Sequence, residues 1–248
     1  MRVRGHIIER GYLNGRQIML DKMKRTVYAI REENTVRFIV SRENYMARDK
    51  ELHHGKIIEA ATAEFLEYGF KDASMRRIAS AAGMSASGLY KHFAGKEEMF
   101  SALVEPAYQG LLDLFRQEMS EQEQHIGKGD LSMWESGSDA KLAITYVFDH
   151  LDAFRLIVCK SQGTKYENFL HELAILEEEA TLSFMKLLRK QGVRINDFSK
   201  KELHLLTTTN VNAVFQTVEH EFSREEALHY ADTLDRFFSG AWREFFGY

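Results

Sequence analysis

Proline occurs only once in the 248 residues, at Pro106, where average composition would supply about a dozen. Because proline is the residue that most strongly breaks a helix, its scarcity favours an all-helical fold. Cysteine also occurs once, at Cys159, which excludes an internal disulfide framework or a multi-cysteine zinc site and suits a reducing cytoplasm. The apolar neighbours Leu156, Ile157 and Val158 predict that this thiol is buried and inert.

Long apolar runs are missing as well. No segment approaches the 18 or so residues that would cross a membrane, and no apolar h-region follows the basic N-terminus, so neither a membrane span nor a secretory signal is predicted. The composition, with 44% hydrophobic and 28% charged residues, is that of a folded globular protein.

Motifs of enzymes are not found either. The sequence contains no nucleophile elbow, P-loop or dinucleotide fingerprint, so an enzyme on a helical scaffold is the least favoured hypothesis. The ten histidines are scattered, without a His-x3-His pair, so we expect no metal and no cofactor.

The charges are unevenly distributed, although the net charge is only −4. Residues 1–50 hold 12 Lys and Arg against 6 Asp and Glu, whereas the remaining residues hold 21 basic and 31 acidic side chains. This asymmetry indicates an anionic partner near the N-terminus. The basic segment is either an arm that reaches DNA or an extension without a role.

The chain is predicted to have three parts. Residues 1–45 form an N-terminal extension, either a genuine part of the protein or a stretch upstream of a start at Met46; β-favouring residues there predict two short strands around a Glu32-Glu33-Asn34 turn. Residues 46–100 and 101–248 are predicted to be two helical domains. Apolar spacing and glycines place helices at 53–68, 74–82, 85–93, 96–119 (kinked at Pro106), 139–162, 166–191, 199–220 and 223–246, with a loop at 120–138.

The most informative stretch is 74–96, where two short helices flank a tight turn. Ala79 is small enough for the helices to cross closely, and Gly83 can adopt the positive φ that the turn needs. Ile78, Met84 and Leu89 are spaced to fill the wedge between the helices. This is the spacing of a helix-turn-helix, whose second helix enters the major groove of DNA.

The charges of this stretch agree with DNA binding. It holds Arg76, Arg77, Lys91 and Lys96 and no acidic residue. Two arginines just inside a helix capped by Ser74 oppose the helix dipole, a penalty that an incoming phosphate would reverse. Tyr90, Lys91 and His92 form a ridge that can hydrogen-bond phosphate oxygens. The alternative is a solvated basic face in which Tyr90 only packs.

Residues 50–104 resemble the N-terminal DNA-binding domain of the TetR family of transcriptional regulators. The resemblance rests on Gly69-Phe70, Ala82-Gly83-Met84-Ser85, Gly88-Leu89-Tyr90-Lys91-His92-Phe93 and Gly95-Lys96-Glu97-Glu98. It implies that Ser74 and Arg76 contact DNA, that Ser85, Ala86 and Ser87 face base edges, and that Tyr90, His92 and Lys96 contact phosphates. The base-facing side chains are small, so base readout is expected to depend on Arg76, Lys91 or DNA shape.

The resemblance also implies an all-helical protein that dimerises through its last two long helices and encloses a ligand pocket in its middle region. The last two helices have broad apolar faces, which predict a homodimer interface at Leu206, Val214, Phe215, Leu234, Phe238 and Trp242. The alternative is that these faces form the core of a monomer. Aromatic residues of the middle region that could line the pocket, or equally form core, are Phe115, Trp134, Tyr146, Phe154, Tyr166 and Phe169.

We therefore predict a dimeric regulator, a repressor of a near-palindromic operator in double-stranded DNA, that is released by a small-molecule effector. The alternative on the same fold is a DNA-binding protein that responds to no ligand or to a protein partner.

Overall fold

The computed structural model describes residues 8–13, 16–21, 25–32, 35–40, 42–128 and 139–246, with side chains over 54–128 and 140–244. The chain divides into two compact units, Met1–Glu59 and Ala60–Tyr248, and each is described by itself.

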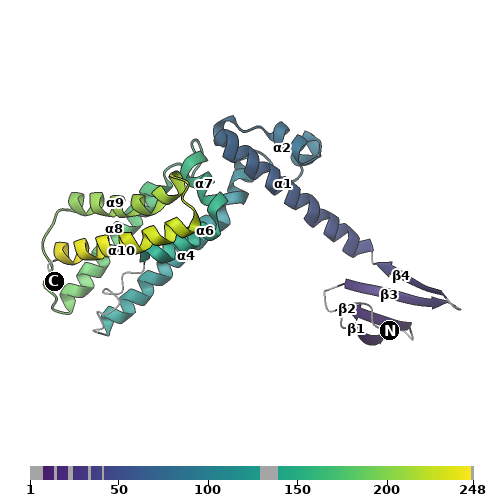
Figure 1. The fold of residues 1–248 in the computed structure, drawn as a ribbon, viewed down its shortest axis with the longest axis horizontal. Coiled ribbons are helices and arrows are strands. Elements are labelled where there is room, and N and C mark those ends of the chain that lie inside the picture. The colour runs from purple at the N-terminus through teal and green to yellow at the C-terminus, as the bar shows by residue number, and fades with distance from the viewer. Residues whose placement is uncertain are drawn as a thin grey trace. The chain divides into compact units, whose positions relative to one another are not determined.

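The first unit contains a four-stranded antiparallel sheet in the order β1-β2-β3-β4, labelled in Figure 1. Its strands are β1 (Ile8–Leu13), β2 (Arg16–Asp21), β3 (Arg25–Glu32) and β4 (Thr35–Val40). Glu32 pairs with Thr35, so the two strands predicted around the Glu32-Glu33-Asn34 turn are confirmed. The strands β1 and β2 were not predicted, because Glu9, Arg10 and Gly11 are poor strand formers in succession.

Beyond residue 41, the described residues (42–128 and 139–246) form helices and no strand, which confirms the all-helical prediction for this part of the chain (Figure 1). No described helix is long and apolar enough to cross a lipid bilayer. The helices are α1 (Arg42–Asp72), α2 (Met75–Ala81), α3 (Ala86–Leu89), α4 (Lys96–Gly127), α6 (Asp139–Asp149), α7 (Leu151–Lys160), α8 (Phe169–Lys190), α9 (Lys200–Glu219) and α10 (Arg224–Phe246).

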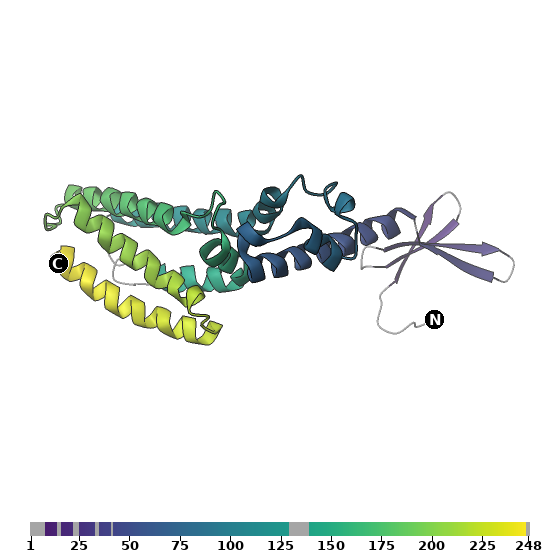
Figure 2. The ribbon, with the colours of Figure 1, turned by 90° about the horizontal axis from the view of Figure 1, so that it is seen from above.

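The long helices α8, α9 and α10 are neighbours, as Figures 1 and 2 show together. Between α7, α8 and α9, the rings of Phe154, Phe169 and Phe215 contact one another with centroids 5.2–6.2 Å apart, and all three side chains are buried. Burial of such aromatic side chains is the main force that holds α7, α8 and α9 together.

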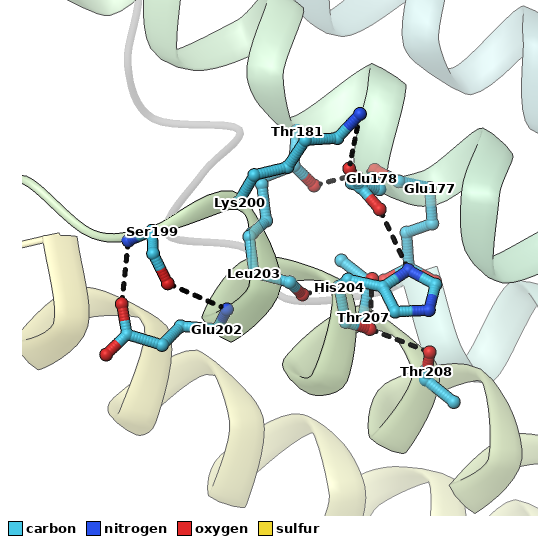
Figure 3. A network of polar contacts seen from close by, with 10 residues as sticks. All are labelled: Glu177, Glu178, Thr181, Ser199, Lys200, Glu202, Leu203, His204, Thr207 and Thr208. Atoms are coloured by element: carbon cyan, nitrogen blue, oxygen red, sulfur yellow. Dashed lines mark hydrogen bonds and ion pairs between the residues drawn. The ribbon is translucent and has the colours of Figure 1, made fainter.

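A polar network also joins α8 to α9 (Figure 3). Glu178 of α8 is buried, with 5% of its surface exposed, and its carboxylate accepts contacts from His204 Nδ1 at 2.9 Å and Lys200 Nζ at 3.5 Å. The first turn of α9 is closed by a capping box, in which Ser199 and Glu202 satisfy each other's backbone N–H groups. The start of α9 is therefore tied both to its own backbone and to α8.

Two predicted helix boundaries were wrong. The segment 120–127 was assigned to a loop but continues α4, because the one apolar residue of this polar turn, Ile126, packs against Met185, Leu188 and Ile195. The predicted helix 139–162 is split at His150, whose φ of −125° and ψ of 35° separate α6 from α7. The helix α4 continues through Pro106.

The prediction that Cys159 is buried was also wrong, because the thiol is exposed. Ile157 faces the core with 1% exposure, and Cys159, two positions further along α7, lies on the side of the helix opposite to it. Apolar neighbours in sequence therefore did not indicate apolar neighbours in space.

Candidate nucleic-acid interface and ligand cavity

The helices α2 and α3 are joined by the tight turn that the sequence predicted. Gly83 has a φ of 71°, and the Met84 N–H donates to the Ala79 carbonyl at 2.9 Å across the turn. Ile78, Ala79 and Leu89 are at most 1% exposed and form the contact between the two helices. Because a residue with a Cβ is strained at this φ, glycine is what permits the close crossing.

The outer face of this pair is polar and accessible. Arg76, Ser85 and Ser87 are exposed, and Tyr90, Lys91 and His92 form an exposed ridge in which Tyr90 is 52% accessible. The regular helix α3 ends at Leu89, earlier than the predicted 85–93, but N–H bonds from Lys91 to Gly88 and from His92 to Leu89 continue the turn. The ridge is thus held in a fixed backbone conformation while its side chains remain free to reach a ligand.

Two of the serines predicted to contact DNA make hydrogen bonds within the domain. Ser85 caps α3, since its Oγ accepts from the Gly88 N–H at 3.1 Å and lies 3.1 Å from Ser87 Oγ. Ser74 stands at the start of α2, but its hydroxyl makes no capping bond; instead its N–H donates to Glu64 Oε1 at 2.7 Å. The prediction that the Ser74 side chain caps α2 was therefore wrong. The hydrogen bond at this end of the helix is accepted instead by the carboxylate of Glu64, from α1. Ala86 is half-buried beside Ser85.

Arg77 is exposed, but its guanidinium is paired with Glu64, a residue that the sequence analysis missed. Its Nε donates to Glu64 Oε1 at 2.8 Å, and its guanidinium lies 4.2 Å from the ring centroid of Tyr68. Burial by itself would raise the pKa of Glu64, but the hydrogen bonds from Arg77 and the Ser74 N–H and the guanidinium charge lower it. The signal available in the sequence was a lone acid between Ala61 and Phe65 on the apolar face of α1. The arrangement gives Arg77 a structural partner, whereas its contact with DNA stays a prediction.

Lys96 likewise contacts its own domain. Its Nζ donates to the carbonyls of Lys71 at 2.7 Å and Ala73 at 3.3 Å and lies 4.8 Å from the ring centroid of Phe70. These bonds fasten the first turn of α4 to the segment between α1 and α2. The predicted phosphate contact of Lys96 stays untested beside this role.

A cavity of about 260 Å³ lies in the helical body, between α4, α6, α8, α9 and α10. Of the predicted pocket residues, Phe115 lines it, whereas Phe154, Tyr166 and Phe169 are buried core residues outside it and Tyr146 packs against Gly110. The open alternative, that these aromatics form core, therefore describes three of the six, and Tyr146 is half-buried. Trp134 lies outside the described residues.

The residues predicted to form a dimer interface are placed differently. Val214, Phe215 and Leu234 are at most 7% exposed within the single chain, and together with Phe238 and Trp242 they line the cavity. All five therefore face the cavity, although Phe238 and Trp242 are only half-buried, and Leu206 is the member of the predicted set that is exposed, at 37%. Leu205 and Phe237, at 66% and 67%, are the strongly exposed apolar residues of α9 and α10.

Comparisons with known proteins find a family match in the part of the chain that contains α2 and α3. Residues 57–103 match the family of bacterial regulatory proteins known as the tetR family. Over 59 residues the chain is 42% identical to the HTH-type transcriptional repressor KstR2 of Mycobacterium tuberculosis, a match that spans 24% of this chain and 28% of that relative.

Similar folds occur among solved structures. A TetR family member from Streptomyces coelicolor is 19% identical and matches 77% of this chain and 89% of its own, with a TM-score of 0.52. A second, from Thermus thermophilus, is 21% identical over 73% of this chain and 94% of its own, with a TM-score of 0.49. At this identity the likeness concerns the fold alone.

Proposed function

We propose that this chain, which belongs to the TetR family of bacterial regulatory proteins through residues 57–103, is a transcriptional regulator that binds operator DNA as a dimer and is released by a small ligand. The observation that carries the proposal is the α2–turn–α3 unit with its exposed ridge of Tyr90, Lys91 and His92. Such a unit places short side chains at base edges and longer ones at phosphates.

DNA contact is assigned to the exposed side of this unit. Lys91 and Arg76 supply positive charge, and Tyr90 and His92 supply hydrogen-bond donors for phosphate oxygens. Ser85 and Ser87 stand at the start of α3, where the bases are met; their hydroxyls contact each other, so one of their two O–H donors is already used. We therefore assign much of the sequence preference to Arg76 and to DNA shape.

The dimer is proposed to form through the outward faces of α9 and α10. Leu205, Leu206 and Phe237 are the exposed large apolar residues among the described side chains of these helices, and burial against a second copy would remove them from water. Two copies related by a twofold axis would present their two α3 helices to the half-sites of a near-palindrome. Repression, rather than activation, is supported by the relative that bears the name of a repressor.

Ligand release requires a physical connection between the cavity and the DNA-binding unit. A chain of ring contacts, with centroids 5.1–6.0 Å apart, supplies one: it runs through Phe215, Phe169, Tyr108, Tyr166, Phe100 and Phe65. Phe215 lines the cavity, and Phe65 is a fully buried residue of α1, the helix that precedes α2. A ligand that fits one arrangement of these rings better than another shifts the population between them.

The test begins with an unbiased selection of bound DNA sequences, followed by measurement of affinity for the selected site at several salt concentrations. We expect Tyr90→Ala to weaken binding by about tenfold and Lys91→Ala to lower the slope of log Kd against log salt by about 1. Lys186→Ala, which removes an exposed lysine of α8, is the matched control. Unchanged affinity and slope in both ridge variants would exclude this face as the DNA contact.

A further inference from the structure

The charged groups of the cavity are all of one sign. Its lining includes Glu118 and Glu123 from α4, Glu177 from α8 and Asp235 from α10, and no Lys, Arg or His among the described lining residues. The neutral polar groups are Gln122, Thr181, Asn210 and Ser239, and the remaining wall is aliphatic and aromatic. An apolar cavity whose charged lining groups are all acidic favours a positively charged ligand group and repels a carboxylate or a phosphate.

Neutral side chains donate hydrogen bonds to three of these acids. Asn210 Nδ2 donates to Glu177 at 2.5 Å, Ser239 Oγ to Asp235 at 3.2 Å, and Ser183 Oγ to Glu123 at 3.4 Å. These bonds orient the carboxylates without cancelling their charge. Glu118, Glu177 and Asp235 are half-buried, whereas Glu123 is exposed, and the hydrogen bonds from Asn210 and Ser239 orient Glu177 and Asp235 in particular.

The aromatic wall adds a second preference of the same sign. Phe115, Phe184, Phe238 and Trp242 line the cavity from three helices. Aromatic faces carry negative potential and attract ammonium groups, most strongly for tryptophan, and they also provide the apolar surface that a hydrocarbon or aryl group needs. The rings and the carboxylates therefore select the same kind of molecule.

We propose that the ligand of this cavity is an apolar molecule with a single positive charge, an aryl- or alkyl-amine, whose ammonium group is held by Glu177 and Asp235. This inference rests on the proposed function, because it assigns a chemical class to the small ligand of that proposal. A cationic ligand of this kind can be distinguished by experiment from an acyl or other anionic ligand, because the cavity would bind a positively charged end group and reject a negatively charged one.

The experiment uses three probes with one skeleton and different ends: 4-phenylbutylamine, 4-phenylbutanol and 4-phenylbutyrate, titrated calorimetrically into the full chain. We expect the amine to bind about tenfold more tightly than the alcohol, and the carboxylate to bind most weakly. In the isosteric variants Glu177→Gln and Asp235→Asn, alone and together, the preference for the amine should fall toward that of the alcohol. Glu179→Gln removes an exposed acid of α8 outside the lining and should leave the preference unchanged.

Tighter binding of the carboxylate, a preference for the amine that persists in the double variant, or no binding of any probe would each overturn the inference. Circular dichroism checks that the variants are folded. If the double variant does not fold, Asp235→Asn alone, which keeps the Glu177–Asn210 hydrogen bond, tests the same preference. The proposed function fails separately, because its test measures DNA affinity without any ligand.

Discussion

Phe238 lines the cavity, and its ring lies edge-on to that of the next residue, Phe237, with the centroids 5.2 Å apart and the planes at 88°. Phe237 points outward and is 67% exposed. Two successive residues of α10 thus connect the inside of the helical body with the face proposed to meet a second copy. A ligand that moves Phe238 would be felt at that face through direct contact.

The outward position of Phe237 predicts its role in assembly. We expect Phe237→Glu to convert the dimer to a monomer at micromolar concentration, because the change places a charge in a surface that must lose water on association. Sedimentation velocity measures the result. Leu176→Glu, at a 37% exposed site on α8, serves as the control and should remain dimeric. A Phe237→Glu protein that still sediments as a dimer would place the interface elsewhere.

The neighbouring arginines Arg76 and Arg77 are predicted to differ in kind. Arg77→Ala should lower the melting temperature by several degrees, because Glu64, only 8% exposed, loses its charged partner. Arg76→Ala should leave the melting temperature unchanged and weaken DNA binding. Thermal unfolding and operator affinity, measured on both variants, separate the two roles; equal melting temperatures in the two variants would contradict the structural assignment of Arg77.

A link between α4 and the segment before α8 predicts a dependence of stability on pH. Lys165 Nζ lies 2.7 Å from Glu105 Oε2, and the Tyr166 hydroxyl donates to the same oxygen. The hydrogen bond from Lys165, then those from Tyr166 and Gln109, lower the pKa of Glu105 from 4.5 to about 2. Because the folded-state pKa is depressed, this stabilisation is complete above pH 4.5 and is lost as the pH falls toward 2.

The comparison of Glu105→Gln with the unmodified chain tests this relation. Urea unfolding at neutral pH should show a loss of about 1 kcal/mol, a modest value because the partly exposed pair is screened by solvent. The difference should shrink as the pH is lowered from 4.5 to 3, while Glu179→Gln shows no such trend. A difference that stays constant with pH would mean that the ion pair contributes little.

Gly110 of α4 and Tyr146 of α6 are predicted to be coupled. A Cβ built on Gly110 would lie 1.9 Å from the Tyr146 hydroxyl oxygen, so Gly110→Ala forces a displacement that we expect to cost about 1–3 kcal/mol. Tyr146→Phe removes that oxygen and should restore much of the loss. The measurement is a double-mutant cycle by chemical denaturation, and strictly additive effects would show that the two residues do not share the contact.

The DNA-binding unit could be predicted in detail because its determinants are local. Gly83, Ala79 and Leu89 lie within eleven residues, and each is required by the geometry of one turn. The interface and the cavity could not be separated in the same way. Val214 and Phe215 belong to an apolar face of α9 wide enough for two neighbours, and periodicity does not indicate which side meets the chain's own core.

The end of α4 was missed for a related reason. Its last two turns are polar apart from Ile126, so the sequence lacks an apolar stripe there, and Ile126 packs against residues of α8 and of the segment that follows it. The role of Glu64 could not be predicted, because its partner Arg77 lies thirteen positions along the chain and the sequence alone does not show that the two are in contact. Contacts between distant segments decide these cases, and a single sequence does not contain them.

The length of α4 has a consequence for how little a ligand needs to do. One helix carries Lys96, bonded to the carbonyls before α2, and also Phe115 and Glu118 at the cavity wall. At 1.5 Å per residue these positions are about 30 Å apart, so a tilt of about 2° at the wall displaces the other end by about 1 Å. A small tilt of α4 at the cavity would therefore move Lys96 far enough to change its hydrogen bonds. A large rearrangement of the helices is not needed.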